Sequence, residues 1–355
     1  MENTCTLKRL SFDEGINLIK SYDLIGLGAK ADKFCRELHP EQYRTYVIDR
    51  NINYTNICIS GCEFCAFYKK KDDKGSYLLS KEDLFQKIEE TVLLGGTQIL
   101  MQGGLHPDFK IDYYIELLRS IKERFDIHIH SFSPPEIVHF SELNNLPVRK
   151  ILILLKDAGL DTIPGGGAEI LTDKCRGLLS PHKCSASEWL QVMREAHKLE
   201  IKSTATMMFG HVETLEDRVV HLEKIRQLQD ETGGFTAFIP WTFQPKNTAL
   251  SLSTKKRVDF EVGGFDYLRT LAVSRLYLDN IPNVQASWVT QGAKIAQLAL
   301  RFGANDMGST MIEENVVKAA GVNYRIKKED IISIIEDLDF HAMQRDCYYN
   351  IVYNN

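Results

Sequence analysis

The sequence contains no long hydrophobic run. Nowhere do about 18 apolar residues stand together, the length that a membrane-spanning helix needs. The N-terminal segment MENTCTLKRLSFDEG also lacks the apolar stretch of a secretory signal peptide. We therefore expect a cytoplasmic protein with no membrane insertion.

The chain has little charge imbalance and no basic patch. Its 43 Lys and Arg residues are nearly matched by 48 Asp and Glu residues, for a net charge of -5. The one cationic run, Lys69 to Lys71, is followed at once by Asp72 and Asp73, which is typical of a solvated loop. We therefore expect no nucleic-acid partner.

Internal repeats and low-complexity tracts are absent, and strand-like runs instead alternate with amphipathic helical segments. The helical segments begin at capping residues such as Ser80 and stop at glycine pairs such as Gly95 and Gly96. Eight strand–helix alternations predict an α/β protein, a parallel (β/α)8 TIM-type barrel. The expected strands span residues 51–56, 97–102, 127–132, 160–164, 203–209, 235–241, 284–288 and 304–307.

The barrel prediction divides the chain into an N-terminal helical extension (1–48), the barrel (49–325) and a C-terminal helix and tail packed on it (326–355). Active sites of such barrels lie where strands end and helices begin. Polar and glycine-rich stretches follow the expected strands and would meet on one face. They are CISGCEFC, QGGLHPD, SPPE, PGGGAE, FGHVET, TFQPKNT, TQG and NDMGST.

Three cysteines in the first of these stretches have no fourth cysteine beside them. Cys58, Cys62 and Cys65 have the spacing C-x₃-C-x₂-C. A structural zinc site needs four ligands, and a redox pair of Cys62 and Cys65 leaves the third thiol without a role. A 4Fe-4S cluster has four irons to ligate, so three thiolates leave one iron open. The odd number favours an iron–sulfur cluster, with zinc and a redox pair as the alternatives.

The other five cysteines are expected to be buried or idle thiols, since a reducing compartment disfavours disulfides. They are Cys5, Cys35, Cys175, Cys184 and Cys347.

The cysteine motif, at the end of the first strand of an expected barrel, resembles the radical S-adenosylmethionine (SAM) superfamily. The resemblance implies that the open iron binds S-adenosyl-L-methionine and that one electron from the cluster releases a 5′-deoxyadenosyl radical. It places Phe64 near the adenine and the backbone of Gln102, Gly103 and Gly104 near the methionine ammonium. Glu169 is expected to contact a ligand amine or ribose, or else to be an ordinary helix N-terminal acid.

Longer strings narrow the resemblance. Over roughly residues 40–325 they resemble the cyclic dehypoxanthinylfutalosine synthases, radical SAM cyclases of the futalosine route to menaquinone. Trp241 in FIPWTFQPKNT and Trp288 in SWVTQG favour this family. Two sister families stay open as alternatives: aminofutalosine synthase and the tyrosine-using subunit of deazaflavin (FO) synthase. The strings are RNINYTNICISGCEFCAFY, ILMQGGLHPD, HSFSPPEI, AGLDTIPGGGAEIL, TATMMFGHVET, QDETGGFTAFIPWTFQPKNT, SWVTQG and FGANDMGSTMIEENVVKAAG.

This resemblance implies a ring closure within dehypoxanthine futalosine. The adenosyl radical would remove hydrogen from ribose carbon 4′, the carbon radical would add to the benzoate ring, and loss of one electron and one proton would restore aromaticity. The implied partners are this small-molecule substrate and an electron donor such as flavodoxin or ferredoxin. An electron-transfer iron–sulfur protein and a non-catalytic scaffold with a zinc site are the alternatives from other classes.

Most candidate residues for the remaining tasks stand after the expected strands, whereas Arg275 stands in a helical pattern. The candidates for proton transfer are His106, Glu169, His211 and Asp306. The candidates for holding the substrate, including its carboxylate, are Trp241, Gln244, Arg275, Trp288, Ser309 and Thr310.

Overall fold

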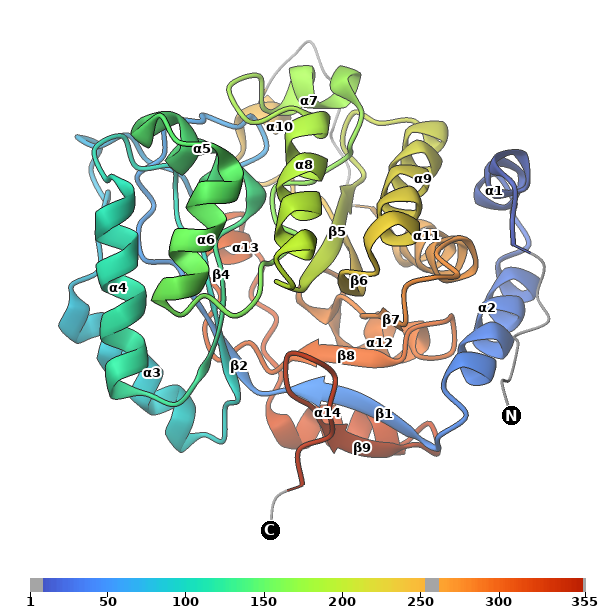
Figure 1. Cartoon of the computed structure of the whole chain (residues 1–355). Coiled ribbons are helices and arrows are strands. Elements are labelled where there is room, and N and C mark those ends of the chain that lie inside the picture. Colours follow the sequence, from blue (N-terminus) through green and yellow to red (C-terminus); the bar gives the residue numbers. More distant parts are fainter. Residues whose placement is uncertain (1–8, 253–261, 354–355) are drawn as a thin grey trace.

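The computed structural model describes residues 9–252 and 262–353, and its strands form three parallel sheets (Figure 1). The sheet orders are β8-β1-β9, β2-β3-β4 and β5-β6-β7. The strands are β1 Tyr43–Val47, β2 Asp49–Ile52, β3 Gln98–Met101, β4 His128–Ser131, β5 Ser203–Phe209, β6 Phe235–Thr242, β7 Asn283–Val284, β8 Asp306–Ser309 and β9 His341–Gln344.

Single parallel bridges connect one sheet with the next. His130 of β4 pairs with Thr162, the neighbouring Ile163 pairs with Ser203 of β5, and Gln285 pairs with Asp306 of β8. Only Ile48 separates β1 from β2.

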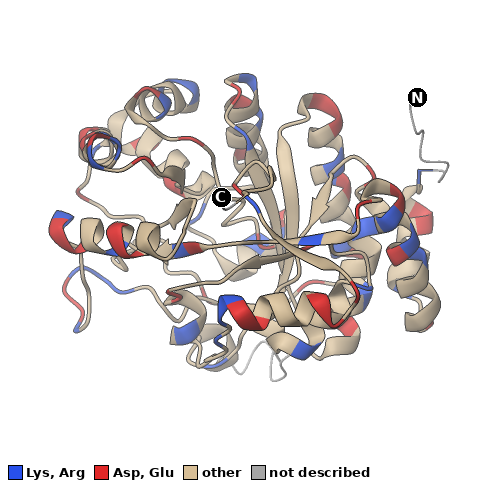
Figure 2. Cartoon of the chain, turned by 90° about the horizontal axis from the view of Figure 1, so that it is seen from below, with Lys and Arg blue, Asp and Glu red and all other residues tan. Residues whose placement is uncertain are grey.

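Helices connect the parallel strands and surround them (Figure 1), which confirms the predicted α/β architecture. Seen from below, Lys, Arg, Asp and Glu gather mainly on these helices rather than on the central strands (Figure 2). The helices are α1 Phe12–Ile19, α2 Leu24–Leu38, α3 Lys81–Leu93, α4 Ile111–Arg124, α5 Pro134–Asn144, α6 Val148–Ala158, α7 Asp173–Leu179, α8 Ala186–Lys198, α9 Leu215–Thr232, α10 Ala249–Leu252, α11 Gly264–Tyr277, α12 Trp288–Ala299, α13 Val316–Ala319 and α14 Lys328–Glu336.

The predicted helix ends are confirmed where capping chemistry is clear. Ser80 is the N-cap of α3 and accepts a hydrogen bond from the backbone N–H of Asp83. Ser185 caps α8 in the same way, and α9 ends on Gly233 in the left-handed conformation.

Several strand predictions need correction. The expected strand 284–288 is reduced to β7, Asn283–Val284, and Trp288 already begins α12. The first expected strand, 51–56, lies earlier as β2, and the expected strand 160–164 is reduced to the bridges of Thr162 and Ile163. β1 and β9 fall within segments 1–48 and 326–355, which were expected to be helical, and they pair with each other in parallel. The last segment is therefore partly a sheet strand and not only a helix and tail.

The apolar core lies between the strands and the helices. Along β3, Ile99 and Met101 are buried in it, while the alternate residues Gln98 and Leu100 face the other way. The same alternation gives the inner side of the strands its polar residues. Within the described ranges, no helix has both the length and the apolar character that crossing a bilayer requires.

The C-terminal segment is fixed to the strands by a buried ion pair. Nη2 and Nε of Arg345, just after β9, lie 2.7 and 3.1 Å from the two carboxylate oxygens of Asp306 in β8. Thr45 and Tyr349 also donate hydrogen bonds to this carboxylate, and the side chains of Arg345 and Asp306 are almost inaccessible to solvent. The arrangement satisfies a charge pair that would otherwise be costly to bury.

We expect Arg345→Ala to lower the free energy of unfolding by about 3–5 kcal/mol, because it leaves the buried Asp306 carboxylate without its cation. Urea denaturation measures the change. Arg149→Ala is the matched control, since Arg149 pairs with Glu195 on the surface and such pairs contribute less than about 1 kcal/mol. Equal losses in both variants would contradict a special role for the Arg345 pair.

Candidate active site

The inner side of the strands encloses a cavity of about 280 Å³. Its wall includes alternate residues of several strands, such as Asp49 and Asn51 of β2 and Thr204 and Thr206 of β5. The segment that follows β7 and the residues after β8 complete the wall. The lining mixes apolar side chains such as Leu100 and Ile239 with a few polar ones, as is typical of ligand sites.

The cysteine loop follows β2 and lies beside one end of this cavity. The loop is held to the segment after β3, because the backbone N–H of Ile59 donates to the carbonyl of Leu105 and that of Gly104 donates to Thr55. Gln102, which lines the cavity, belongs to this same segment. The segment after β3 therefore joins the cysteine loop to the cavity wall, although none of the three cysteines lines the cavity.

Gly104 makes this close approach possible. A Cβ atom at this position would lie 2.2 Å from the carbonyl oxygen of Ile57 and 2.9 Å from the Cβ of Cys58. The adjacent Gly103 packs on the Tyr54 ring, and its N–H donates to the buried carboxylate of Glu136. The glycines thus serve a packing need as well as any contact with a ligand.

The three thiols differ in burial. Cys62 is buried, whereas Cys58 and Cys65 are partly accessible. Burial raises the pKa of Cys62 to about 11, although Lys183 acts in the opposite direction. The isolated thiol is then protonated at neutral pH, and binding a metal is what would make it a thiolate.

The chemistry of the three thiols allows two kinds of metal centre to be compared. In the part of the chain that the structure describes, no three His, Cys, Asp or Glu side chains converge closely enough to hold one metal ion. A zinc ion would require all its ligand atoms at about 2.0–2.3 Å from one point. The thiolates of a 4Fe-4S cluster each bind a different iron, so they need not converge. Cys58, Cys62 and Cys65 supply three thiols from one short loop, the donor type that such a cluster binds.

A cation that the sequence did not single out lies next to the cysteine loop. Nζ of Lys183 is 2.9 Å from Oε1 of Glu169 and 5.2 Å from the centre of the Phe64 ring. Burial by itself would lower the pKa of Lys183, but Glu169 and Cys62 outweigh it and raise the pKa. Lys183 therefore stays charged and links the PGGGAE loop with the cysteine loop.

Glu169 is buried and held in place by a second cation. Oε2 of Glu169 lies 3.4 Å from Nη1 of Arg176, which also donates to the carbonyls of Gly167 and Ala168. Glu169 has a φ of 41°, a conformation that is unusual for a residue with a side chain. The carboxylate is placed by these contacts, and it belongs to the cysteine side of the site.

Four of the predicted residues line the cavity: Gln102, Trp241, Trp288 and Ser309. The indole N–H of Trp288 donates to the carbonyl of Ser309 at 2.9 Å, and the hydroxyl of Ser309 donates to Asp49. The two tryptophans come from β6 and from the start of α12. The structure thus brings together loops that lie far apart in the sequence.

Two predicted residues lie outside the cavity lining because other partners hold them. The guanidinium of Arg275 donates to the carbonyls of Gly303, Ile281 and Pro282 and is completely buried behind the sheet. Asp306 is occupied by Arg345. The structure does not bring Arg275 to a substrate carboxylate or Asp306 to a substrate proton.

The two predicted histidines are also held away from the cavity lining. Nε2 of His211 lies 2.8 Å from the carbonyl oxygen of Met208, and Nδ1 lies 2.9 Å from Glu213. The His106 ring stacks on Phe109 at 3.8 Å between centres, and burial lowers its pKa. Both rings have local structural partners.

Gln244 and Thr310 are buried beside the site but do not line it. The amide of Gln244 donates to Thr242, and the hydroxyl of Thr310 has no hydrogen-bond partner among the described residues. Phe64 packs in a small apolar cluster with Met208 and Phe243. These three residues support the walls of the site.

Several lining residues were missed by sequence reasoning. Arg345, Cys347 and Tyr349 reach the cavity from the C-terminal segment, where no motif announces them. Four more lining residues carry polar groups on the inner side of the strands or just after them: Asp49, Gln98, His130 and Glu314. The period-two alternation of the strands was the one signal that could have pointed to the first three of these.

The remaining cysteines that the structure describes are free thiols. Cys35, Cys175 and Cys184 are buried and free, as expected, and Cys347 is buried at the cavity, while Cys5 lies outside the described residues.

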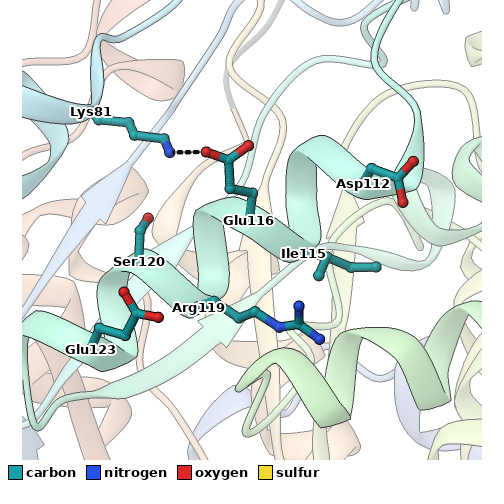
Figure 3. Close-up of a pocket in the computed structure, with 7 residues that line it drawn as sticks. All are labelled: Lys81, Asp112, Ile115, Glu116, Arg119, Ser120 and Glu123. Carbon is teal, nitrogen blue, oxygen red and sulfur yellow. Dashed lines mark hydrogen bonds and ion pairs between the residues drawn. The ribbon is translucent and has the colours of Figure 1, made fainter.

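A second hollow, of about 440 Å³, lies on the outside along α4, where Lys81 pairs with Glu116 (Figure 3). It is open and lined by mixed charges, and it contains none of the predicted residues.

Comparison with protein families places two regions of the chain. Residues 52–225 match the radical SAM superfamily, and residues 232–354 match the CofH/MqnC C-terminal region. The solved structure of methylornithine synthase shares the fold, with a TM-score of 0.72, 17% identity and 94% coverage of each chain.

Curated relatives match nearly the whole chain. The cyclic dehypoxanthine futalosine synthase of Halalkalibacterium halodurans is 46% identical over 99% of this chain and 94% of its own. The enzyme of the same name from Streptomyces coelicolor is 41% identical over 96% and 85%. The 5-amino-6-(D-ribitylamino)uracil–L-tyrosine 4-hydroxyphenyl transferase of Methanococcoides burtonii is 44% identical over 87% and 86%. The chain therefore belongs to the radical SAM superfamily and, within it, to the family of the cyclic dehypoxanthine futalosine synthases.

Proposed function

We propose that this protein is a radical SAM cyclase that converts dehypoxanthine futalosine into its cyclic product in menaquinone biosynthesis. The observation that carries the proposal is the juxtaposition of a three-cysteine loop with a cavity lined by Trp241 and Trp288. Near full-length similarity to cyclic dehypoxanthine futalosine synthases supports the choice of reaction.

The site is best understood if the strands form one closed (β/α)8 barrel. The parallel bridges at Thr162, Ile163 and Gln285, together with the short break at Ile48, support continuity from β2 through β8 and back to β1. The cavity is then the barrel interior, and the loops that follow the strands surround its mouth. The domain division follows from this, with 49–325 as the barrel, extended by β1.

Cys58, Cys62 and Cys65 would hold a 4Fe-4S cluster, whose remaining iron is left for S-adenosyl-L-methionine. When bound, this pair of cofactors supplies a one-electron cleavage that yields a 5′-deoxyadenosyl radical. The residues assigned to the cofactor side are Phe64, Gln102, Gly103, Gly104 and Glu169. Lys183 joins them, because its charge lies between Glu169 and the cysteine loop.

The chain's own task is to orient the substrate and to exclude water. Part of the cavity wall is apolar and consists of Ile239, Trp241, Trp288 and Val289. Polar groups that could anchor a substrate come from Gln102 and Thr290. A highly reactive radical attacks whatever C–H bond lies nearest. The walls must therefore present ribose carbon 4′ and the benzoate ring together and keep other groups at a distance.

The cofactor also needs an external electron. We propose a protein donor such as flavodoxin or ferredoxin, and a location in the cytoplasm. Ile59, inside the cysteine motif, is 55% exposed, so the loop reaches the surface. That exposure supports electron delivery from outside at this edge of the molecule.

We expect Cys62→Ala to abolish both the visible absorbance of the reconstituted cluster and the formation of 5′-deoxyadenosine, because one of only three ligands is lost. Cys35→Ala is the control, since Cys35 is a buried thiol of α2 outside the cavity lining. Anaerobic reconstitution, iron analysis and chromatography measure the outcome. A colourless protein that binds one zinc ion would contradict the cluster.

We expect Gly104→Ala to reduce the iron content after reconstitution, because the new Cβ would displace Ile57 and Cys58. Gly177→Ala is the matched control. A Cβ atom at Gly177, in α7, meets nothing within 4 Å, so the change should be neutral or stabilise the helix by up to about 1 kcal/mol. Iron analysis with thermal unfolding of both variants tests this, and equal iron contents would count against the packing argument.

A substrate panel under reductant distinguishes the cyclase from its sisters. We expect turnover of dehypoxanthine futalosine, and none of the enolpyruvyl benzoate or of tyrosine with the ribityl uracil. The tyrosine reaction is the second candidate because a relative with that activity in its name is 44% identical. Turnover of either alternative substrate without turnover of dehypoxanthine futalosine would overturn the assignment.

A further inference from the structure

The cavity is lined by a buried histidine to which neither cofactor binding nor substrate binding has been assigned. His130 of β4 lines the cavity, and its Nδ1 lies 2.7 Å from Oγ1 of Thr162. Among the residues that the structure describes, the hydrogen bond recorded for the ring is that of Nδ1, and none is recorded for its Nε2. That nitrogen is available to a molecule in the cavity.

A second histidine continues the line of hydrogen bonds away from the cavity. Nε2 of His128 lies 2.7 Å from the same Thr162 hydroxyl. His128 stands two residues before His130 on the same face of β4 and is only half-buried, whereas His130 is buried. The chain of three side chains therefore runs from the cavity toward the N-terminal ends of the strands.

The Thr162 hydroxyl is suited to connect two imidazoles. A hydroxyl donates one hydrogen bond and accepts two. It can accept from Nδ1–H of His130 and donate to Nε2 of His128 at the same time. Cys347, whose sulfur lies 3.3 Å from the hydroxyl oxygen, is the other neighbour.

The surroundings of the two rings lower the pKa of both, so each imidazole favours its neutral form. Burial lowers the pKa of His130 to about 3, and His128 and Arg345 act in the same direction. Burial also lowers the pKa of His128; Asp161 and Asp346 oppose this, and Lys122 adds to it. The Tyr348 ring packs edge-on against His128 at 5.1 Å.

We propose that His130, Thr162 and His128 form a proton relay that removes the proton lost when the cyclised substrate regains its aromatic ring. The proposal rests on the proposed cyclase function. His130 is assigned as the catalytic residue, because it lines the cavity and its Nε2 would take the proton from the substrate, while Thr162 and His128 are positioning residues that act through it.

The step balances as one proton and one electron. The cyclised radical loses its electron to a one-electron acceptor of the iron–sulfur class, and the resulting arenium carbon breaks its C–H bond as Nε2 of His130 takes the proton. His130 passes its Nδ1 proton to Thr162, and Thr162 passes its own to Nε2 of His128, which releases a proton from Nδ1 to solvent. An arenium ion is a strong acid, so a base of low pKa suffices and does not retain the proton.

The test compares Thr162→Val, which keeps the shape but removes the hydroxyl, with Thr162→Ser, which keeps the hydroxyl. With cluster, S-adenosyl-L-methionine and dehypoxanthine futalosine, we expect Thr162→Val to lower the rate of cyclic product formation about 100-fold. 5′-Deoxyadenosine should still form, so the ratio of 5′-deoxyadenosine to product rises. Thr162→Ser should restore both values to near those of the unmodified enzyme.

A second readout does not need the loaded enzyme. Nitrogen NMR of histidine-labelled protein without cofactors should show that Thr162→Val shifts the ring signals of His128 and His130 and leaves the other histidines unchanged. If Thr162→Val does not fold, His128→Asn replaces it, and the same rise in the ratio is expected.

The outcomes separate the two proposals. An unmodified enzyme that does not cyclise the substrate means that the proposed function fails. An unmodified enzyme that cyclises it, with a folded Thr162→Val or His128→Asn variant of unchanged product rate and ratio, overturns the relay while the function stands.

Discussion

The cavity depends on the buried ion pair between Arg345 and Asp306. This pair ties the C-terminal segment to β8, and the same segment places Cys347 and Tyr349 in the cavity lining. Without this ion pair, the C-terminal segment would no longer be held against β8, and water could enter the cavity from that side. The pair is therefore a fold constraint with a chemical consequence, because radical chemistry requires a site from which water is excluded.

The opposite end of the cavity depends on close backbone packing. Gly104 lets the cysteine loop lie directly on the segment after β3, and Gln102 of that segment faces the cavity. Lys183 forms a buried ion pair with Glu169 of the PGGGAE turn and also lies over the ring of Phe64 in the cysteine loop. The segment after β3 thus joins the cysteine loop to the cavity wall, and Lys183 and Arg176 hold Glu169 beside the loop.

Local patterns in the sequence predicted a large part of this arrangement. Capping serines and terminal glycines gave the ends of α3, α8 and α9, and the cysteine spacing gave the motif that matches the radical SAM superfamily. Trp241 and Trp288 were predicted from their strings and do line the cavity. The partners of Arg275 and Asp306 could not be predicted, since Arg345 lies 39 residues from Asp306 and backbone carbonyls carry no sequence signal. The contacts of His130 and Thr162 could not be predicted for the same reason, since they join residues of neighbouring strands that lie 32 positions apart in the sequence.

The proposed cyclisation requires that the cavity present ribose carbon 4′ of dehypoxanthine futalosine to the adenosyl radical. The most direct measurement uses this substrate with deuterium at carbon 4′ and follows the label by mass spectrometry. We expect one deuterium in the recovered 5′-deoxyadenosine, formed together with the cyclic product. Cyclic product accompanied by unlabelled 5′-deoxyadenosine would contradict this expectation.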